Sequence, residues 1–88
     1  MFDSKLVVSN LNEILSLVRE GLSESQLDDI RTYVNVGEWN LALEVLCQML
    51  YEDKLPIPSR AYDLFQEVGA MVHLNSKTWE IVKSQVIN

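Results

Sequence analysis

The chain has little of the material from which cross-linked or loop-rich folds are built. Its 88 residues include one cysteine, two prolines and three glycines. The lone Cys47 excludes an internal disulfide and is consistent with a reducing compartment. The sequence also has no glycine-rich phosphate-binding loop, which excludes a nucleotide site of that kind. We therefore expect a fold that an apolar core holds together.

Long apolar runs are also missing. The N-terminus lacks a basic segment, and the apolar residues that follow it are interrupted by Asn10, Asn12 and Glu13. This pattern predicts neither a signal peptide nor a membrane span. The default expectation is a cytoplasmic protein.

Basic residues are scarce, and the acidic excess is concentrated in one region. Seven Lys and Arg stand against thirteen Asp and Glu, which gives a net charge of −6. Residues 20–53 alone carry −7, whereas residues 1–19 are neutral and residues 54–88 carry +1. Nucleic acids and anionic membranes are bound through Lys and Arg, so direct binding to either is not expected. A basic protein is the favoured partner.

The residues that could support catalysis do not form a motif. Cys47, His73 and Asp63 are the ingredients of a nucleophilic triad, but no local signature accompanies them and Cys47 lies among apolar residues. No metal-binding spacing surrounds His73, whose expected role is to end a helix. We expect no enzyme activity, no cofactor and no metal site.

Chain length bounds both the fold and its surface. With 48% hydrophobic residues, residues 1–88 are expected to form one domain with a single core. Size scaling predicts a folded surface on the order of 5,000 Å². A typical protein interface of roughly 800 Å² per partner would cover about a sixth of that surface.

The first half of the chain reads as two helices. Apolar spacing predicts a helix over residues 4–20, with Asp3 as its N-cap, Phe2 packed on Val7, and Gly21 ending it in a left-handed conformation. A second helix is expected over residues 24–36. Its start carries a capping box formed by Ser23 and Gln26, and Gly37 is expected to end it.

Residues 38–52 form the most apolar segment and the expected centre of the fold. One apolar face consists of Trp39, Leu43, Leu46 and Leu50, and a second of Leu41, Val45 and Met49. Only a narrow stripe through Asn40, Glu44, Gln48 and Tyr51 is polar. A helix of this kind needs neighbours on most sides. We expect an all-α, compact bundle of about five helices packed around it.

The remaining segments complete that bundle. Residues 54–58 contain both prolines and are expected to cross the molecule in extended form, anchored by Leu55 and Ile57. Ser59 is expected to cap a helix over residues 60–72, in which Gly69 marks a close helix crossing. A last helix, capped by Asn75 or Ser76, is expected to reach nearly to the C-terminus with Trp79 buried.

Several short motifs recur in a known family. They are Gly21-Leu22-Ser23, Val36-Gly37-Glu38-Trp39 running into Leu41-Ala42-Leu43-Glu44 and Leu46-Cys47, then Pro56-Ile57-Pro58, Tyr62 and Trp79. Together they resemble the MafI-like immunity proteins, which accompany bacterial polymorphic and contact-dependent growth-inhibition toxins. The resemblance covers about two-thirds of the chain.

The resemblance implies a bacterial cytoplasmic antitoxin that acts as a monomer or weak dimer. It would bind a cognate toxin domain with a basic surface, often a nuclease, and occlude its active site or substrate groove. From charge and expected exposure we predict the partner-binding residues, with Tyr51 as an aromatic anchor: Glu24, Asp28, Glu38, Glu44, Tyr51, Glu52 and Asp53. Helix capping and solubility are the other explanation for these acids. The alternative function is a small acidic helical adaptor or regulator that binds a host protein.

Overall fold

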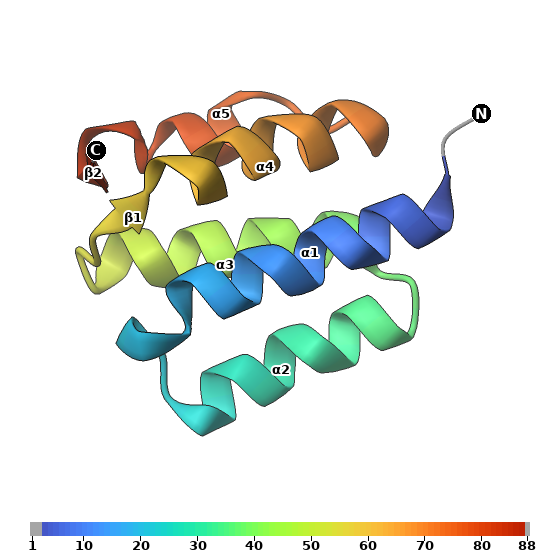
Figure 1. Ribbon diagram of the computed structural model, residues 1–88, viewed down its shortest axis with the longest axis horizontal. Helices are drawn as coiled ribbons and strands as arrows, with labels where there is room; N and C mark the ends of the chain where they lie inside the picture. Colours follow the sequence, from blue (N-terminus) through green and yellow to red (C-terminus); the bar gives the residue numbers. More distant parts are fainter. Residues whose placement is uncertain (1–2, 88) are drawn as a thin grey trace.

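The computed structural model describes residues 3–87 and confirms the all-α bundle (Figure 1). Helices that follow one another in the chain run antiparallel, so α3 and α5 run in the same direction. The closest helix pairs are α1 with α4 and α2 with α3, and α5 packs on α3. The molecule measures 33 × 25 × 18 Å and exposes 5267 Å². Its helices are α1 (Ser4–Val18), α2 (Glu24–Asn35), α3 (Trp39–Glu52), α4 (Ser59–Met71) and α5 (Lys77–Glu80).

Helix α1 begins as predicted and ends differently. The Asp3 carboxylate accepts hydrogen bonds from the backbone N–H groups of Lys5 and Leu6, which caps the helix. After Val18 the chain tightens into a 3₁₀ turn, Arg19–Gly21. Gly21 does not adopt the predicted left-handed conformation. The lack of a side chain instead leaves room for Leu55, whose Cδ1 would lie 2.8 Å from an added Cβ. The predicted contact of Phe2 lies outside the described residues.

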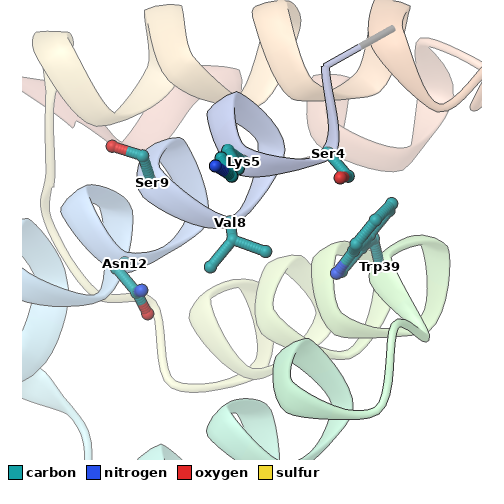
Figure 2. A pocket seen from close by; sticks show the side chains of 6 residues that line it. All are labelled: Ser4, Lys5, Val8, Ser9, Asn12 and Trp39. Carbon is teal, nitrogen blue, oxygen red and sulfur yellow. The ribbon is translucent and has the colours of Figure 1, made fainter.

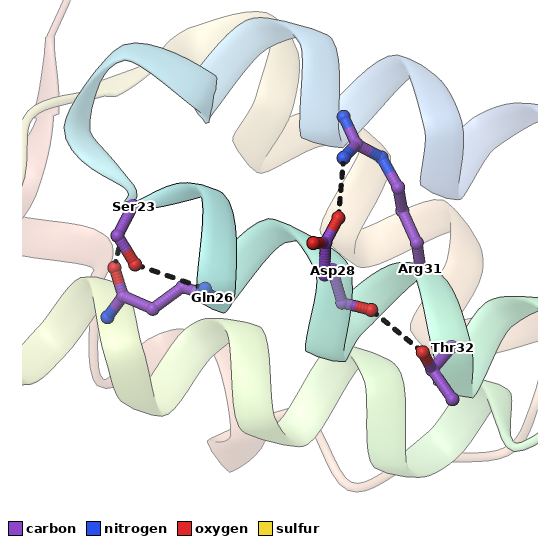
Figure 3. A network of polar contacts seen from close by, with 5 residues as sticks. All are labelled: Ser23, Gln26, Asp28, Arg31 and Thr32. Atoms are coloured by element: carbon purple, nitrogen blue, oxygen red, sulfur yellow. Dashed lines mark hydrogen bonds and ion pairs between the residues drawn. The ribbon is translucent and has the colours of Figure 1, made fainter.

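The capping box that begins α2 is confirmed (Figure 3). The backbone N–H of Gln26 donates to Ser23 Oγ at 3.1 Å, and the Ser23 N–H donates to Gln26 Oε1 at 2.9 Å. Two N–H groups at the helix start are thereby satisfied by side chains. The entry into α2 is fixed by residues that are only three positions apart.

Three helices end in the same hydrogen-bonded motif. After α2, Gly37 has a φ of 80°, its N–H donates to Val34 O, and the next N–H donates to Tyr33 O. These two bonds satisfy carbonyl groups in the last turn that have no partner within the helix. The same pattern follows α3 at Lys54 and α4 at His73, with φ of 51° and 58°. His73 does end a helix, as predicted, but by adopting the left-handed conformation.

Helix α3 is buried along one side. Leu43, Leu46 and Leu50 are fully buried in the core that it shares with its neighbours. Asn40, Glu44, Gln48 and Tyr51 are exposed, as the sequence indicated. The second apolar face is only partly covered, because Leu41 is 39% exposed while Val45 and Met49 are half-buried. Trp39, predicted as a core residue, is also half-buried.

The C-terminal segment differs most from expectation. Helix α5 has four residues and is followed by a 3₁₀ turn, Lys83–Gln85, and by strand β2 (Val86–Ile87). Strand β2 pairs in parallel with β1 (Ile57–Pro58), the predicted extended crossover. The amide of Gln85 donates to Leu50 O at 2.8 Å and to Leu55 O at 2.9 Å, which draws the chain out of a helical path.

Two expected helix caps near the C-terminal half had different outcomes. Ser59 does not cap α4, because it is the first helical residue and makes no side-chain cap bond. The residue before Ser59 is Pro58, which has no backbone N–H that would need a hydrogen-bond partner. Before α5, Asn75 Oδ1 accepts a hydrogen bond from the backbone N–H of Lys77 at 2.9 Å.

Gly69 marks a close contact between α4 and α5, as predicted. A Cβ placed on Gly69 would overlap the six-membered ring of Trp79, which is itself buried. The absence of a side chain at this position therefore lets the indole lie directly on the α4 backbone. This contact fixes the position of the short α5, which has few turns of its own to hold it.

Gly69→Ala should destabilise the protein. Overpacking costs roughly 1–3 kcal/mol, which exceeds the gain of about 1 kcal/mol from the better helix propensity of alanine. A lower melting temperature in thermal unfolding would report the change. In a Trp79→Leu background the penalty should shrink, because the colliding ring is gone. Equal penalties in both backgrounds would contradict the contact.

His73→Gly should stabilise the protein by about 0.5–1 kcal/mol. A left-handed residue other than glycine is strained by roughly 1–2 kcal/mol, and glycine relieves this at some cost in unfolded-chain entropy. His73→Ala is the matched control, because alanine keeps the strain. Urea unfolding of the three proteins tests this expectation, and an alanine variant as stable as the glycine variant would refute it.

Candidate functional site

Negative charge lies on the surface of the α2–α3 half of the molecule. Every acid between residues 20 and 53 is exposed. Exposed carboxylates remain hydrated, so they add little to the free-energy cost of folding. Packing of the core therefore does not explain why there are so many of them here. These acids are Glu20, Glu24, Asp28, Asp29, Glu38, Glu44, Glu52 and Asp53.

Part of the predicted site is brought together on α3. Glu44, Tyr51 and Glu52 are spaced by seven and eight residues and therefore share the exposed side of the helix. Tyr51 is 50% exposed, which leaves its ring available to a partner. Glu38 precedes the first turn of α3 and Asp53 follows its last, so both ends of the helix carry an exposed carboxylate.

The other predicted residues lie on a different flank. Asp28 forms an ion pair with Arg31 at 3.3 Å, and Arg31 reaches toward α1 (Figure 3). There Arg31 lines a small hollow together with α1 residues that include Asn12 and Ser16. Glu24 is one turn before Asp28 and so lies on the same side of α2. Glu24 and Asp28 are thus separated from the α3 acids by the width of α2.

Sequence reasoning missed the row of α2 that borders α3. Gln26, Asp29, Tyr33 and Val36 recur at helical spacing on one side of α2. The Gln26 amide lies 3.5 Å from the Asp53 carboxylate, which shows that this side faces the end of α3. Val36 is 67% exposed, and Tyr33 is half-buried. Asp29 follows Gln26 by three residues, and this helical spacing could have assigned Asp29 to the side of α2 that faces α3.

An apolar row on α3 runs beside that row of α2. The apolar row is Leu41, Val45 and Met49, each four residues from the next. The antiparallel packing of α2 and α3 sets Tyr33 and Val36 near its first half. We call the whole surface the α2–α3 face, and its residues are Asp29, Tyr33, Val36, Glu38, Leu41, Glu44, Val45, Met49, Tyr51, Glu52 and Asp53.

All the charged residues of the α2–α3 face are acidic. It carries five carboxylates, and Lys54 at the end of α3 is the nearest base along the chain. Within residues 3–87 the ion pairs are Arg31 with Asp28 and Arg60 with Glu13, and both lie outside this face. The field over the face is therefore negative, and because the face is exposed its reach is set by salt screening.

A second surface hollow lies between α1 and the start of α3 (Figure 2). It is an open groove of about 590 Å³ lined by Val8, Trp39 and polar residues of α1 that include Lys5. The Trp39 indole N–H donates to Val34 O at 3.1 Å, which fixes the ring against the end of α2. Trp39 lies on the side of α3 opposite Glu44, so this groove is separate from the α2–α3 face.

The geometry offers no support for catalysis by Cys47. The thiol is buried, and burial raises its pKa to about 12. A nucleophilic cysteine needs the opposite shift, because the thiolate is the reactive form. Asp63 and His73 are exposed on and after α4. Across the described residues, His, Cys, Asp and Glu form no group of three that could hold a metal ion.

Comparisons with known proteins find no relative of this chain. The chain matches no family model, no curated protein and no solved structure. The likeness to MafI-like immunity proteins thus stays a prediction from the sequence motifs. In residues 3–87, none of the helices has the length and apolar character needed to cross a bilayer.

The Cys47 thiol should be inert in the native protein. Its burial and raised pKa keep it protonated near neutral pH, so modification by a thiol reagent should be on the order of 100-fold slower than in urea. A matched control carries Cys47→Ala and Ser25→Cys, which moves the thiol to the exposed side of α2 and should react at once. Rapid labelling of the native thiol at position 47 would show that the site opens.

Proposed function

We propose that this protein is an immunity protein that binds and neutralises a basic toxin domain through the α2–α3 face. The observation that carries the proposal is the concentration of five exposed carboxylates on one face, beside exposed apolar side chains. A partner that fits this surface presents positive charge around an apolar centre. Nuclease domains supply the positive charge, because they bind nucleic acid through Lys and Arg.

The chemistry of the face suits fast and selective capture. Opposite fields raise association rate constants toward 10⁸–10⁹ M⁻¹s⁻¹ at low salt and reject partners of like charge. An inhibitor must reach a toxin before the toxin reaches its substrate. A helix of 14 residues such as α3 is about 21 Å long, enough to lie across a substrate groove and exclude a nucleic acid from it.

The motif resemblance supports the choice of a toxin as partner. The resembling motifs include Val36 to Trp39 and Leu41 to Glu44, which form the α2–α3 turn and the first half of α3. These segments contribute Val36, Glu38, Leu41 and Glu44 to the face. The same region that resembles immunity proteins is therefore part of the surface that we assign to the partner.

Charge reversal on α3 should weaken toxin binding far more than charge reversal on α2. In Glu44→Lys with Glu52→Lys, the association rate constant for a catalytically inactive form of the proposed cognate toxin domain should fall at least about tenfold at low salt. Glu24→Lys with Asp28→Lys is the control, with the same net charge on the other flank. It should lose less than about threefold. Stopped-flow or surface-binding kinetics measure both.

Equal losses in the two double variants would mean that net charge, and not the α2–α3 face, drives association. Rescue of cells that express the active toxin domain tests the function itself. A folded wild-type chain that neither binds nor rescues would overturn the immunity proposal and leave the adaptor as the better explanation.

A further inference from the structure

Helix α3 has more apolar surface than the fold covers. Leu43, Leu46 and Leu50 fill the core, while the apolar row of Leu41, Val45 and Met49 reaches the surface. One exposed leucine is ordinary in a soluble protein. Here Leu41 continues a row that α2 extends with Tyr33 and Val36, so the exposed apolar atoms lie together on one face.

Acids border this row at its ends and on both sides. Glu38 precedes Leu41 by three residues, and Glu52 follows Met49 by three, so both lie nearly in line with the row. Glu44 is on the solvent side of the row and Asp29 is on the α2 side. The apolar centre is therefore surrounded by carboxylates whose charge selects what can dock there.

We propose that the apolar row seats a basic amphipathic helix of the toxin domain, an inference that rests on the proposed function. Met49 follows Leu41 by eight positions, or about 12 Å of helix axis. Anchors at positions i, i+4 and i+7 of a docked helix cover a similar length, about 10.5 Å. Lys and Arg on both sides of those anchors then meet the bordering carboxylates.

The backbone of the face favours a helix over an extended peptide. The N–H and C=O groups in the middle of α2 and α3 are bonded within their own helices, and both C-terminal turns are closed by backbone bonds. The face therefore offers side chains to a partner, and no free backbone groups with which a strand could pair. A docked helix satisfies its own backbone groups, whereas a lone strand would leave them to water or unpaired. A second copy of this chain is disfavoured, because it would set carboxylates against carboxylates.

Two synthetic peptides of about 15 residues test the inference. Both contain the same leucines, lysines and arginines, and only the first places its leucines at i, i+4, i+7 and i+11 with basic residues on either side. Titration calorimetry with the full chain should show at least about tenfold tighter binding of the first peptide. Two variants accompany the wild type. Leu41→Ser with Val45→Thr alters the row, and Leu6→Ser removes a leucine that is 47% exposed on α1.

The tighter binding should be lost in the Leu41 and Val45 double variant and retained in Leu6→Ser. Circular dichroism melting confirms that both variants are folded. Equal binding of the two peptides, absence of binding by either, or full binding to the double variant would each overturn the inference. Rescue from the active toxin separates the two proposals. If the double variant has no peptide preference but still rescues cells, the docking inference fails and the immunity function stands. If the wild type binds the first peptide specifically but does not rescue cells, the immunity function alone is overturned.

Discussion

The burial of one side of α3 is the interaction on which the rest of the molecule depends. Leu43, Leu46 and Leu50 are wholly removed from water, and α2, α4 and α5 all pack on this helix. Each such side chain contributes roughly 1.5–3 kcal/mol relative to an exposed one, a large share of the stability of a small domain. Once these three positions face inward, helical geometry leaves no freedom for the others. Glu44, Tyr51 and Glu52 must face solvent, and the face that we assign to a partner is the reverse of the core.

Much of the fold could be predicted because its signals are local. The capping box of Ser23 and Gln26 acts over three residues, and Gly37 is the residue that a left-handed turn favours. The C-terminal turns at Lys54 and His73 use the same hydrogen bonds but lack glycine, so composition gave no indication of their conformation. The short α5 was missed for another reason. Gln85 bonds to Leu50 O and Leu55 O, which are thirty or more residues away in sequence, and no local pattern reports such contacts.

The candidate site was predictable only in part, and the missing part is geometric. Charge counting selected Glu44, Glu52 and Asp53, which the fold does bring to one face, and also Glu24 and Asp28, which it sends to the α1 side of α2. Residues of both groups are exposed and negatively charged. What separates them is the rotation of α2 about its axis, which follows from packing against α1 and α3 at once. The apolar row was visible in the sequence as a second face of α3, but a covering helix was expected there and the chain has none to supply within residues 3–87.

The acids and the apolar row make sense together rather than separately. An apolar surface alone would bind many partners and would promote association of the protein with itself. A charged surface alone binds with little dependence on shape and weakens as salt rises. In the function that we propose, carboxylates placed around Leu41, Val45 and Met49 repel a second copy and any acidic protein, while the apolar side chains hold a partner that arrives with the opposite charge. Under this proposal, charge determines which partner approaches and how fast it associates, and burial of the row determines how slowly the complex dissociates.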